Sequence, residues 1–315
     1  MELKLGIIMD PIEAIKPYKD STFAILLEAQ SRNWPIFYME QSDLVLRDGR
    51  VYGYMRRLYV SDDNTNWYHF TEGYTQPLST LDVILMRIDP PISLEYMYTT
   101  YLLEMVEATG TLVVNKPQSL RDINEKLYTA WYPECCPATL VSKDIEQLTA
   151  FLQEHDDIVV KPLNAMGGKG VFRVRTDDVN CRVILETLTH YGQHTIMAQV
   201  FLPEVAKGDK RIILINGEPI PYALLRVPAS GEIRANLAAG AQGLGVELTE
   251  QDQWICAQVG PMLREKGVLF AGLDVIGDYL TEINITSPTG IRQIDDHYDI
   301  NISAALLDCI ETLLE

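Results

Sequence analysis

The sequence has little positive charge and few cysteines. Lysine and arginine number 26 against 44 aspartates and glutamates, which gives a net charge of −18. Such an acidic chain is repelled by the phosphates of nucleic acids and anionic membranes, so we expect neither as a partner. The five cysteines are odd in number and show no CxxC spacing, which favours reduced core thiols and a cytoplasmic protein.

Long apolar runs are also missing. No stretch approaches the roughly 18 apolar residues that a membrane span requires. The opening MELKLGIIMDP has too short an apolar run for a signal peptide, and Asp10 interrupts it. Low-complexity tracts and internal repeats are absent as well. With 315 residues, 47% of them apolar, the chain can bury a large core divided among two or three domains.

The first third of the chain alternates strand and helix patterns. Continuous apolar runs at 3–9, 36–39, 81–87 and 111–115 predict buried strands, and the amphipathic stretch 21–32 predicts a helix after the first of them. This alternation indicates βαβ units. We therefore expect an α/β fold that begins with a doubly wound, Rossmann-like domain.

Two further signals lie within this first third. The segment 47–50 carries an Asp48-Gly49 hairpin signal, which predicts a small antiparallel excursion. A helix is expected between Ser93 and Gly110, and its apolar residues recur at helical spacing: Leu94, Tyr98, Tyr101, Leu102 and Met105. That stripe predicts the buried face of the helix.

After residue 119 the pattern changes to mixed helices and hairpins. SLRD at 119–122 predicts a capping box that opens a helix through Trp131. Thr249 and Asp252 predict a second capping box, at the start of a helix over 250–266. The stretch 212–220, with Asn216-Gly217 at its centre, predicts a hairpin. Antiparallel modules therefore follow the doubly wound domain.

Polar side chains follow several strands of the predicted sheet, where ligands bind in open α/β folds. Asp10 follows the first strand, and Arg87 and Asp89 end the third predicted run. Arg87 could grip a carboxylate with two hydrogen bonds and Asp89 could accept from an ammonium, which would suit an amino-acid-like substrate. Alternatively, Arg87 and Asp89 pair with each other as a structural link.

The segment 157–175 places glycines and lysines between two strand patterns. Gly167, Gly168 and Gly170 surround Lys169, and such a loop can bring backbone N–H groups to a phosphate. It is not a P-loop, because the alternating VFRVR that follows predicts a strand and not a helix. An ordinary turn remains the alternative. Lys161 favours the phosphate, because a lysine in an apolar run must meet an anion or leave the core.

The stretch LDVIGDYLTEINIT at 273–286 places acidic side chains in a buried hairpin. With a three-residue loop at 277–279, Asp274 faces Glu282, and both share a face with Asn284. Opposed carboxylates repel each other unless a cation lies between them. Oxygen ligands of this kind suit Mg²⁺ or Mn²⁺. The alternative is a solvated polar face.

In this order, the glycine hairpin, the cationic strand 208–215 and the acidic hairpin resemble the ATP-grasp ligases. The resemblance to bacterial glutathione synthetases is closer and extends over essentially the whole chain. It rests on GIIMDPI (6–12), ILMRIDPP (84–91), KPQSLRDINEKLYTAW (116–131), VVKPLNAMGGKGVFRV (159–174), DKRIILINGEPIPYALLR (209–226), RANLAAG (234–240) and LDVIGDYLTEINITSPTGIRQI (273–294). RIDPP and NITSPTG are not required of a generic ATP-grasp protein.

The resemblance implies an ATP-grasp fold behind the Rossmann-like domain and ATP-dependent joining of γ-glutamylcysteine to glycine through an acyl phosphate. It implies three domains, at 1–122, 123–200 and 201–315, and a homo-oligomer, with a tetramer suggested by the family. Two Mg²⁺ or Mn²⁺ ions would act with ATP. The alternatives are another ATP-grasp carboxylate–amine ligase, such as a D-alanine–D-alanine or glutamate-adding enzyme, and a noncatalytic ATP-binding module.

The resemblance also assigns roles to individual residues. Nucleotide contacts are expected from Lys126, Lys161, Met166, Gly167, Gly168, Lys169, Gln199, Val200, Phe201, Leu202, Asp209 and Lys210. The metal ligands are expected to be Asp274, Glu282 and Asn284. Substrate contacts are expected from Asp10, Arg87, Asp89, Ser287, Pro288, Thr289 and Gly290. Arg211, Arg226 and Arg234 would stabilise the transferred phosphoryl group and the acyl phosphate.

The glycine-rich stretch 228–245 is expected to be a mobile loop that covers the acyl phosphate, with Arg234 as its working cation. The sequence departs from the family pattern after this arginine. A second arginine often follows the AAG glycines in the family, and Gln242 stands here. That difference puts one loop–phosphate contact in doubt, not the reaction.

Overall fold

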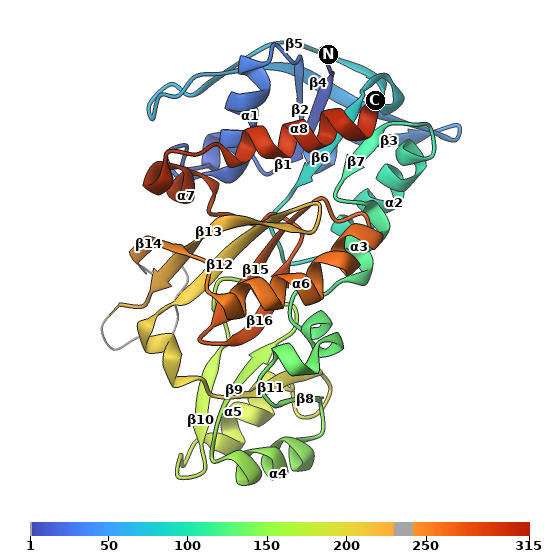
Figure 1. Ribbon diagram of the computed structural model, residues 1–315. Helices are drawn as coiled ribbons and strands as arrows, with labels where there is room; N and C mark the ends of the chain where they lie inside the picture. Colours follow the sequence, from blue (N-terminus) through green and yellow to red (C-terminus); the bar gives the residue numbers. More distant parts are fainter. Residues whose placement is uncertain (1, 230–241) are drawn as a thin grey trace.

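The structure is a computed structural model that describes residues 2–229 and 242–315. Three sheets follow one another along the long axis of the molecule (Figure 1). The N-terminal sheet lies at one end, the C-terminal sheet in the middle and the central sheet at the other end. Both chain termini lie beside the N-terminal sheet (Figure 1). None of the described helices is long and apolar enough to cross a membrane.

The N-terminal sheet has a parallel core, as predicted. Its strand order is β3-β4-β2-β1-β6-β7, with β5 paired to β4, and β2, β1, β6 and β7 run parallel. The antiparallel part of this sheet is larger than predicted. In addition to the hairpin of β3 and β4, a long hairpin of β4 and β5 extends from the edge of the sheet. The strands are β1 (Leu5–Met9), β2 (Ile36–Met39), β3 (Leu44–Arg47), β4 (Arg50–Val60), β5 (Tyr68–Pro77), β6 (Val83–Arg87) and β7 (Leu112–Val114).

Helix α2 (Leu94–Glu107) exposes much of the stripe that its spacing predicted as buried. Leu94, Tyr98 and Tyr101 are 71%, 52% and 50% exposed. The buried face carries two threonines whose hydroxyls donate to carbonyls of their own helix, so their burial costs little. The prediction of the buried face was wrong because these threonines interrupt the apolar residues Tyr96, Leu103 and Val106 that share the buried face.

The helix predicted from the SLRD box through Trp131 is also shorter than expected. Helix α3 (Pro117–Asp122) ends at Ile123, which has extended backbone angles. The side chain of Asn124 then accepts from the backbone N–H groups of Lys126 and Leu127 and starts a separate 3₁₀ turn. This break turns Lys126 away from the path of α3 and toward the centre of the molecule.

The central sheet has its own small core. Its order is β10-β9-β11-β8, and the glycine hairpin joins β9 to β10 as predicted. Helices α4 (Ile145–His155) and α5 (Cys181–Leu188) cover one face with leucines and isoleucines. The strands are β8 (Thr139–Ser142), β9 (Asp157–Pro162), β10 (Phe172–Arg175) and β11 (Ile196–Val200).

The C-terminal sheet is antiparallel, in the order β14-β13-β12-β15-β16. The hairpin at Asn216-Gly217 and the capping box of Thr249 and Asp252 are confirmed. Gln242 begins β14, so the last part of the predicted loop 228–245 is a strand. The elements are β12 (Asp209–Ile215), β13 (Glu218–Val227), β14 (Gln242–Glu247), α6 (Glu250–Glu265), β15 (Phe270–Ile276), β16 (Tyr279–Asn284) and α7 (Ile291–Tyr298).

The N-terminal and C-terminal sheets are joined directly. The amide of Asn115, just after β7, accepts from Phe270 N at 2.9 Å and donates to Phe270 O and Ile285 O at 2.7 and 2.6 Å. Helix α8 (Ile302–Leu314) also returns to the N-terminal sheet and packs beside α1 (Ser21–Ser31), as Figure 1 shows. The last helix of the predicted domain 201–315 therefore covers the first one.

Short 3₁₀ helices complete the described chain, at Ile12–Ala14, Gln41–Asp43, Leu78–Thr80, Leu127–Trp131, Pro133–Cys135 and Pro203–Lys207. The one at Pro203–Lys207 connects the central sheet to β12. Because residues 201–208 form the passage between two sheets, this segment borders the cavity described next.

Candidate active site

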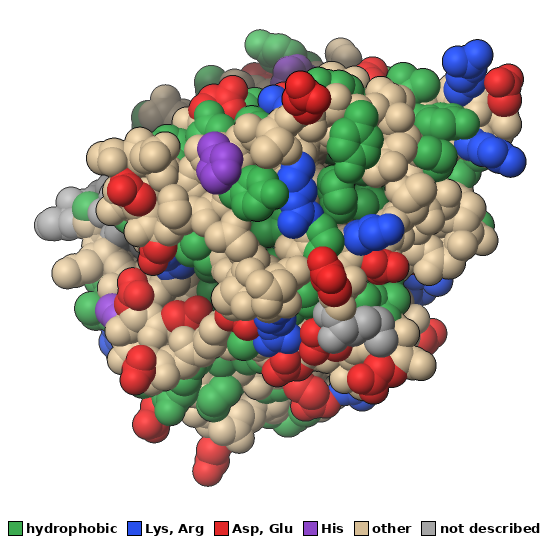
Figure 2. Space-filling view, turned by 90° about the horizontal axis from the view of Figure 1, so that it is seen from above, with side chains coloured by type: hydrophobic (Ala, Val, Ile, Leu, Met, Phe, Trp, Pro, Cys, Tyr) green, Lys and Arg blue, Asp and Glu red, His purple; other side chains and the backbone are tan. Residues whose placement is uncertain are grey.

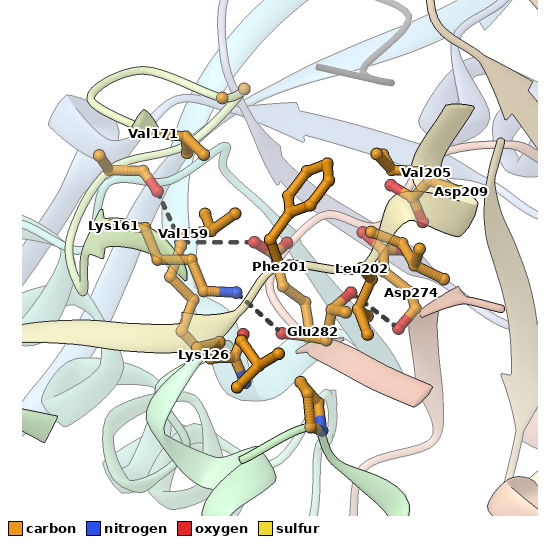
Figure 3. Close-up of a pocket in the computed structure, with 18 residues that line it drawn as sticks. Lys126, Val159, Lys161, Val171, Phe201, Leu202, Val205, Asp209, Asp274 and Glu282 are labelled. Atoms are coloured by element: carbon orange, nitrogen blue, oxygen red, sulfur yellow. Dashed lines mark hydrogen bonds and ion pairs between the residues drawn. The ribbon is translucent and has the colours of Figure 1, made fainter. Parts of the chain in front are cut away.

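A cavity of about 910 Å³, open solvent included, lies between the central and C-terminal sheets (Figure 3). It brings together predicted nucleotide residues from segments far apart in the sequence. The predicted residues that line it are Lys126, Lys161, Gly167, Gly168, Gln199, Val200, Phe201, Leu202, Asp209, Asp274 and Glu282. The passage from β11 to β12 forms one wall, and the glycine hairpin forms another.

Lys161 enters this cavity from β9 and is buried. Its Nζ lies 3.4 Å from the carbonyl oxygen of Thr281, and within the described part of the chain it forms no ion pair. Burial lowers the pKa of Lys161, although nearby Glu282 opposes the shift. A buried ammonium with so little compensation is poised to bind an anion.

Lys126 approaches the same cavity from the turn after α3. Its Nζ lies 2.6 Å from Glu125 Oε1, 2.6 Å from the carbonyl oxygen of Ala165 and 3.8 Å from Glu282 Oε1. Burial opposes its charge, but Glu282 and Glu125 outweigh burial and raise the pKa of Lys126. Lys126 is therefore charged at neutral pH, and Glu282 is one of its partners.

The glycine hairpin contributes backbone rather than side chains. Gly167 and Gly168 have φ of 65° and 76°, which other residues rarely adopt, and both line the cavity. Met166 and Gly167 face the neighbouring cavity, described below. The predicted contact Lys169 is exposed and lines neither cavity.

The acidic hairpin has the predicted pairing but not the predicted loop. Asp274 faces Glu282, and Gly272 faces Asn284, while the turn contains only Gly277 and Asp278. The register shifts between Asp274 and Val275, so a bulge takes up the extra residue. A hydrogen bond of 3.1 Å from Thr281 Oγ1 to the Asp274 carbonyl stabilises it. The prediction of a three-residue loop was wrong. A two-residue turn combined with the bulge also places Asp274 opposite Glu282.

The donor chemistry of this face fits a divalent ion that prefers oxygen. Asp274 and Glu282 line the first cavity, while Glu282 and Asn284 line its neighbour. The third donor of this set is the side-chain amide of Asn284. Among the described residues no three His, Cys, Asp or Glu side chains lie close enough together to hold a metal. Two carboxylates and an amide match Mg²⁺ or Mn²⁺ better than zinc.

Two arginines hold Asp274. Arg211 Nε and Nη2 lie 2.5 and 3.0 Å from its two oxygens, and Arg226 Nη2 lies 3.0 Å from Oδ2. Burial would raise the pKa of Asp274, but Arg211 and Arg226 outweigh burial and hold it below its usual range. Arg226 also donates to Asp209 Oδ2 at 2.6 Å. Burial raises the pKa of Asp209 to about 7, against the opposing effect of Arg226.

The predicted nucleotide contact Lys210 points elsewhere. Its Nζ pairs at 2.5 Å with Asp252 of the α6 capping box, and it lines neither cavity. Lys210 alternates with Asp209 and Arg211 along β12, so it projects from the opposite face of the sheet. In this structure Lys210 ties α6 to β12.

A second cavity lies beside the first, next to the N-terminal sheet. Arg211 and Arg226 line it, as do Asp89, Ser287, Pro288 and Thr289 among the predicted substrate residues. Sequence reasoning missed several other lining residues: Lys16, Lys19, Asp20, Glu125 and Gln293. The first three lie in the irregular segment before and at the cap of α1, where no motif signals a site.

Arg87 has structural partners instead of an open guanidinium. Its Nε donates to Thr22 Oγ1 at 3.1 Å and its Nη2 donates to the Pro288 carbonyl at 2.8 Å. Burial lowers its pKa to about 10. It forms no ion pair with Asp89 among the described contacts, so the expected structural link between these two residues is not seen. Instead, Arg87 supports the turn after β16.

The remaining predicted residues lie at the edges of the site. Asp10 accepts from the Asp89 backbone N–H at 2.9 Å and lines a separate depression next to Glu40 and Glu95. The Gly290 backbone N–H donates to Ser21 Oγ at 3.0 Å, which fixes the turn to α1. Arg234 lies outside the described residues.

Models of known families match both halves of the chain. Residues 3–121 match the prokaryotic glutathione synthetase N-terminal domain, and residues 125–299 match the prokaryotic glutathione synthetase ATP-grasp domain. The glutathione synthetase of Pseudomonas aeruginosa is 55% identical over 314 residues, covering 100% of this chain and 99% of the relative. That of Coxiella burnetii is 52% identical over 312 residues, covering 99% and 97%.

Solved structures agree on the fold. A crystal structure of the D-cycloserine synthetase DcsG superposes with a TM-score of 0.66 at 13% identity, covering 99% of both chains. The D-alanyl-alanine synthetase A of Vibrio cholerae superposes with a TM-score of 0.59 at 14% identity, covering 100% and 99%. The ATP-grasp fold behind an N-terminal α/β domain is thus confirmed, and the chain belongs to the prokaryotic glutathione synthetase family.

Proposed function

We propose that the protein joins γ-glutamylcysteine to glycine, with conversion of ATP to ADP and phosphate, and so forms glutathione. Membership of the family supports this reaction. One structural observation supports it most: two adjoining cavities share a boundary at which four cations meet the carboxylates of one hairpin. The cations are Lys126, Lys161, Arg211 and Arg226. This arrangement suits the transfer of phosphate between two anions.

The nucleotide would occupy the first cavity. Lys126 and Lys161 would hold its α- and β-phosphates, under the backbone N–H groups of Gly167 and Gly168. The adenine would lie along Gln199 to Leu202, and Asp209 borders the same space. Lys169 and Lys210 stay as proposed contacts, although neither lines the two cavities in the ligand-free structure.

Asp274, Glu282 and Asn284 would hold two Mg²⁺ or Mn²⁺ ions together with the nucleotide phosphates. When bound, these ions would neutralise phosphate charge and favour transfer of the terminal phosphoryl group. The chain itself positions the oxygen donors of two neighbouring strands, β15 and β16, around one metal site. The backbone pairing of Asp274 with Glu282 holds these donors opposite each other.

The dipeptide would occupy the second cavity, with its cysteinyl carboxylate near Arg211 and Arg226. A carboxylate oxygen attacks the terminal phosphorus, the bond to the ADP oxygen breaks, and an acyl phosphate forms. The glycine amine then attacks the acyl carbon and phosphate leaves with the electron pair of its C–O bond. Arg211 and Arg226 would stabilise the charge that develops on the carbonyl oxygen. Arg234 keeps its expected role as a proposal.

The test of this function is the release of ADP. We expect turnover only when γ-glutamylcysteine, glycine and Mg²⁺ are all present with ATP, because each step requires the previous one. A coupled assay for ADP, with each component omitted in turn, measures this. Turnover with D-alanine alone would overturn the assignment.

We further propose that the protein is a cytoplasmic homo-oligomer with three domains divided near residues 122 and 200. The five cysteines are free in the structure, which suits a reducing compartment. The stripe of α2 defined by Leu94, Tyr98, Tyr101 and Met105 is exposed, and α2 lies beside β4. Hydrophobic side chains also gather near the charged tip of the β3–β4 hairpin (Figure 2). A second copy of the chain is a fitting partner for such a surface.

Replacing Tyr98 by glutamate on this stripe is expected to lower the assembled mass by at least half, because a charge would be buried at the interface. Light scattering coupled to size-exclusion chromatography measures the mass. Val183→Glu, at an exposed position on α5, is a matched control and should not change it. An unchanged mass for the Tyr98 variant would place the interface elsewhere.

A further inference from the structure

The carboxylates of the proposed metal face are already paired with cations. Arg211 contacts both oxygens of Asp274, Arg226 contacts one of them, and Lys126 lies 3.8 Å from Glu282. These are the same cations that the reaction would direct at phosphate and substrate. The two halves of the site therefore neutralise each other before any ligand arrives, and ligand binding must exchange these contacts.

Arg226 differs from Arg211 in having a second carboxylate. Arg226 Nη2 lies 2.6 Å from Asp209 Oδ2 and 3.0 Å from Asp274 Oδ2. Asp209 faces Arg226 directly across the β12–β13 ladder, so this pair is set by the register of the sheet. Arg211 has no other carboxylate partner within residues 2–229 and 242–315; its remaining contact is to the Thr289 carbonyl at 3.2 Å.

Asp209 also stands between the two cavities. It lines the first, whereas Arg226 lines the second. Asp209 is buried, and its Oδ1 has no hydrogen-bond partner among the described residues. In Figure 3 Asp209 lies near Asp274 at the end of the first cavity, away from Lys161. Within the described part of the chain Arg226 is the one cation paired with Asp209, and a buried carboxylate depends strongly on such a partner.

We propose that Asp209 is a positioning residue that keeps Arg226 in the reaction centre when Asp274 exchanges its two arginines for a divalent cation. This inference rests on the proposed function. During the exchange Arg211 loses Asp274, its one carboxylate partner among the described residues, and becomes available to the carboxylate of the dipeptide. Arg226 does not become a buried, unpaired charge, because Asp209 still holds it. Cation binding and dipeptide binding then favour each other, by the same factor in both directions.

The first test uses the unaltered protein. Isothermal titration measures the affinity of γ-glutamylcysteine with and without saturating Mn²⁺ and a nonhydrolysable ATP analogue. We expect affinity to rise about tenfold when both are present, within the usual range of coupling between sites. Equal affinities would overturn the proposal. Normal release of ADP without this coupling would refute the exchange alone, whereas no release of ADP would refute the proposed function.

The second test isolates Asp209. We expect Asp209→Asn to weaken Mn²⁺ binding about tenfold, as followed by the electron paramagnetic resonance of the free ion. The reason is that, of the two described carboxylates paired with Arg226, only Asp274 would then remain. The titration uses tripolyphosphate in place of ADP, so that a contact from Asp209 to a ribose cannot contribute. An unchanged Mn²⁺ affinity would overturn the proposal.

An Arg226→Met background completes the test. If Asp209 acts through Arg226, Asp209→Asn should have no further effect on Mn²⁺ affinity once the arginine is gone. A tenfold loss that persists in this background would make Asp209 a metal ligand itself and overturn the proposal. Glu218→Gln, an exposed carboxylate on β13 of the same sheet, is the matched control and should leave Mn²⁺ affinity unchanged. If Asp209→Asn does not fold, the titration of the unaltered protein can still overturn the proposal, because equal dipeptide affinities would exclude the exchange.

Discussion

Replacing Glu282 by glutamine is expected to lower the rate of ligation by about 1,000-fold, comparable to the loss of a preorganised electrostatic contact in other enzymes. Glutamine keeps the shape of the side chain but removes its charge. Asp274 would then be the only carboxylate on the metal face. Lys126 would remain in place, since Glu125 lies 2.6 Å from its Nζ. The loss should therefore be in turnover and not in folding.

The ADP assay measures the rate, and circular dichroism during heating measures the fold. The thermal midpoint of Glu282→Gln should stay close to that of the unaltered protein, because Glu282 is partly exposed and its pair with Lys126 is long, at 3.8 Å. Glu218→Gln serves as the control on the same sheet. Near-normal activity of the Glu282 variant would mean that the metal face is misassigned.

Replacing Lys161 by methionine should weaken ATP binding by about 30-fold or more without destabilising the fold. Removing one partner of a buried charge pair costs about 2–5 kcal/mol, and each 1.4 kcal/mol is a factor of ten in affinity. Without nucleotide, however, the ammonium of Lys161 has only a long contact to the Thr281 carbonyl. Methionine fills a similar volume without a charge to desolvate, so the free energy of unfolding should be unchanged or higher.

Fluorescence titration with a labelled nucleotide measures the affinity, and urea unfolding of the ligand-free protein measures stability. Lys143→Met, which lies between β8 and α4 and lines neither cavity, is the matched control. A large loss of stability in Lys161→Met would show that the lysine serves the fold. Unchanged nucleotide affinity would remove Lys161 from the nucleotide site.

Local patterns in the sequence were enough to predict the parallel strands of the N-terminal sheet and the hairpins at 212–220 and 273–286. Continuous apolar runs identified the parallel strands, Asn216-Gly217 identified a turn, and the alternation at 273–286 identified which residues share a face. These signals are local, because a strand's faces and a turn's dihedral angles depend on a few adjacent residues. The pairing of Asp274 with Glu282 could be predicted even though the loop was wrong, since only that pairing separates polar from apolar side chains.

Long-range contacts explain the predictions that failed. The buried face of α2 is the one that packs against α3, β4 and β7. The predicted pairing of Arg87 with Asp89 is absent among the described contacts, because Arg87 donates to the Pro288 carbonyl, 201 residues away in the sequence. Lys16, Lys19 and Asp20 were missed because only the folded chain brings this irregular segment to the second cavity. In each case the role of the residue depends on neighbours that the sequence does not place beside it.

The three hydrogen bonds of Asn115 restrict how the enzyme can move. They link the end of β7 in the N-terminal sheet to Phe270, at the start of β15, and to Ile285, just after β16. Hydrophobic clusters also join these two sheets, whereas the central sheet has a core of its own, so we expect any hinge to lie between the central sheet and the other two. A hinge there would uncover the spent nucleotide while the arginines and the Pro288 turn stay in register, so release of ADP need not disturb the surface that selects the next dipeptide.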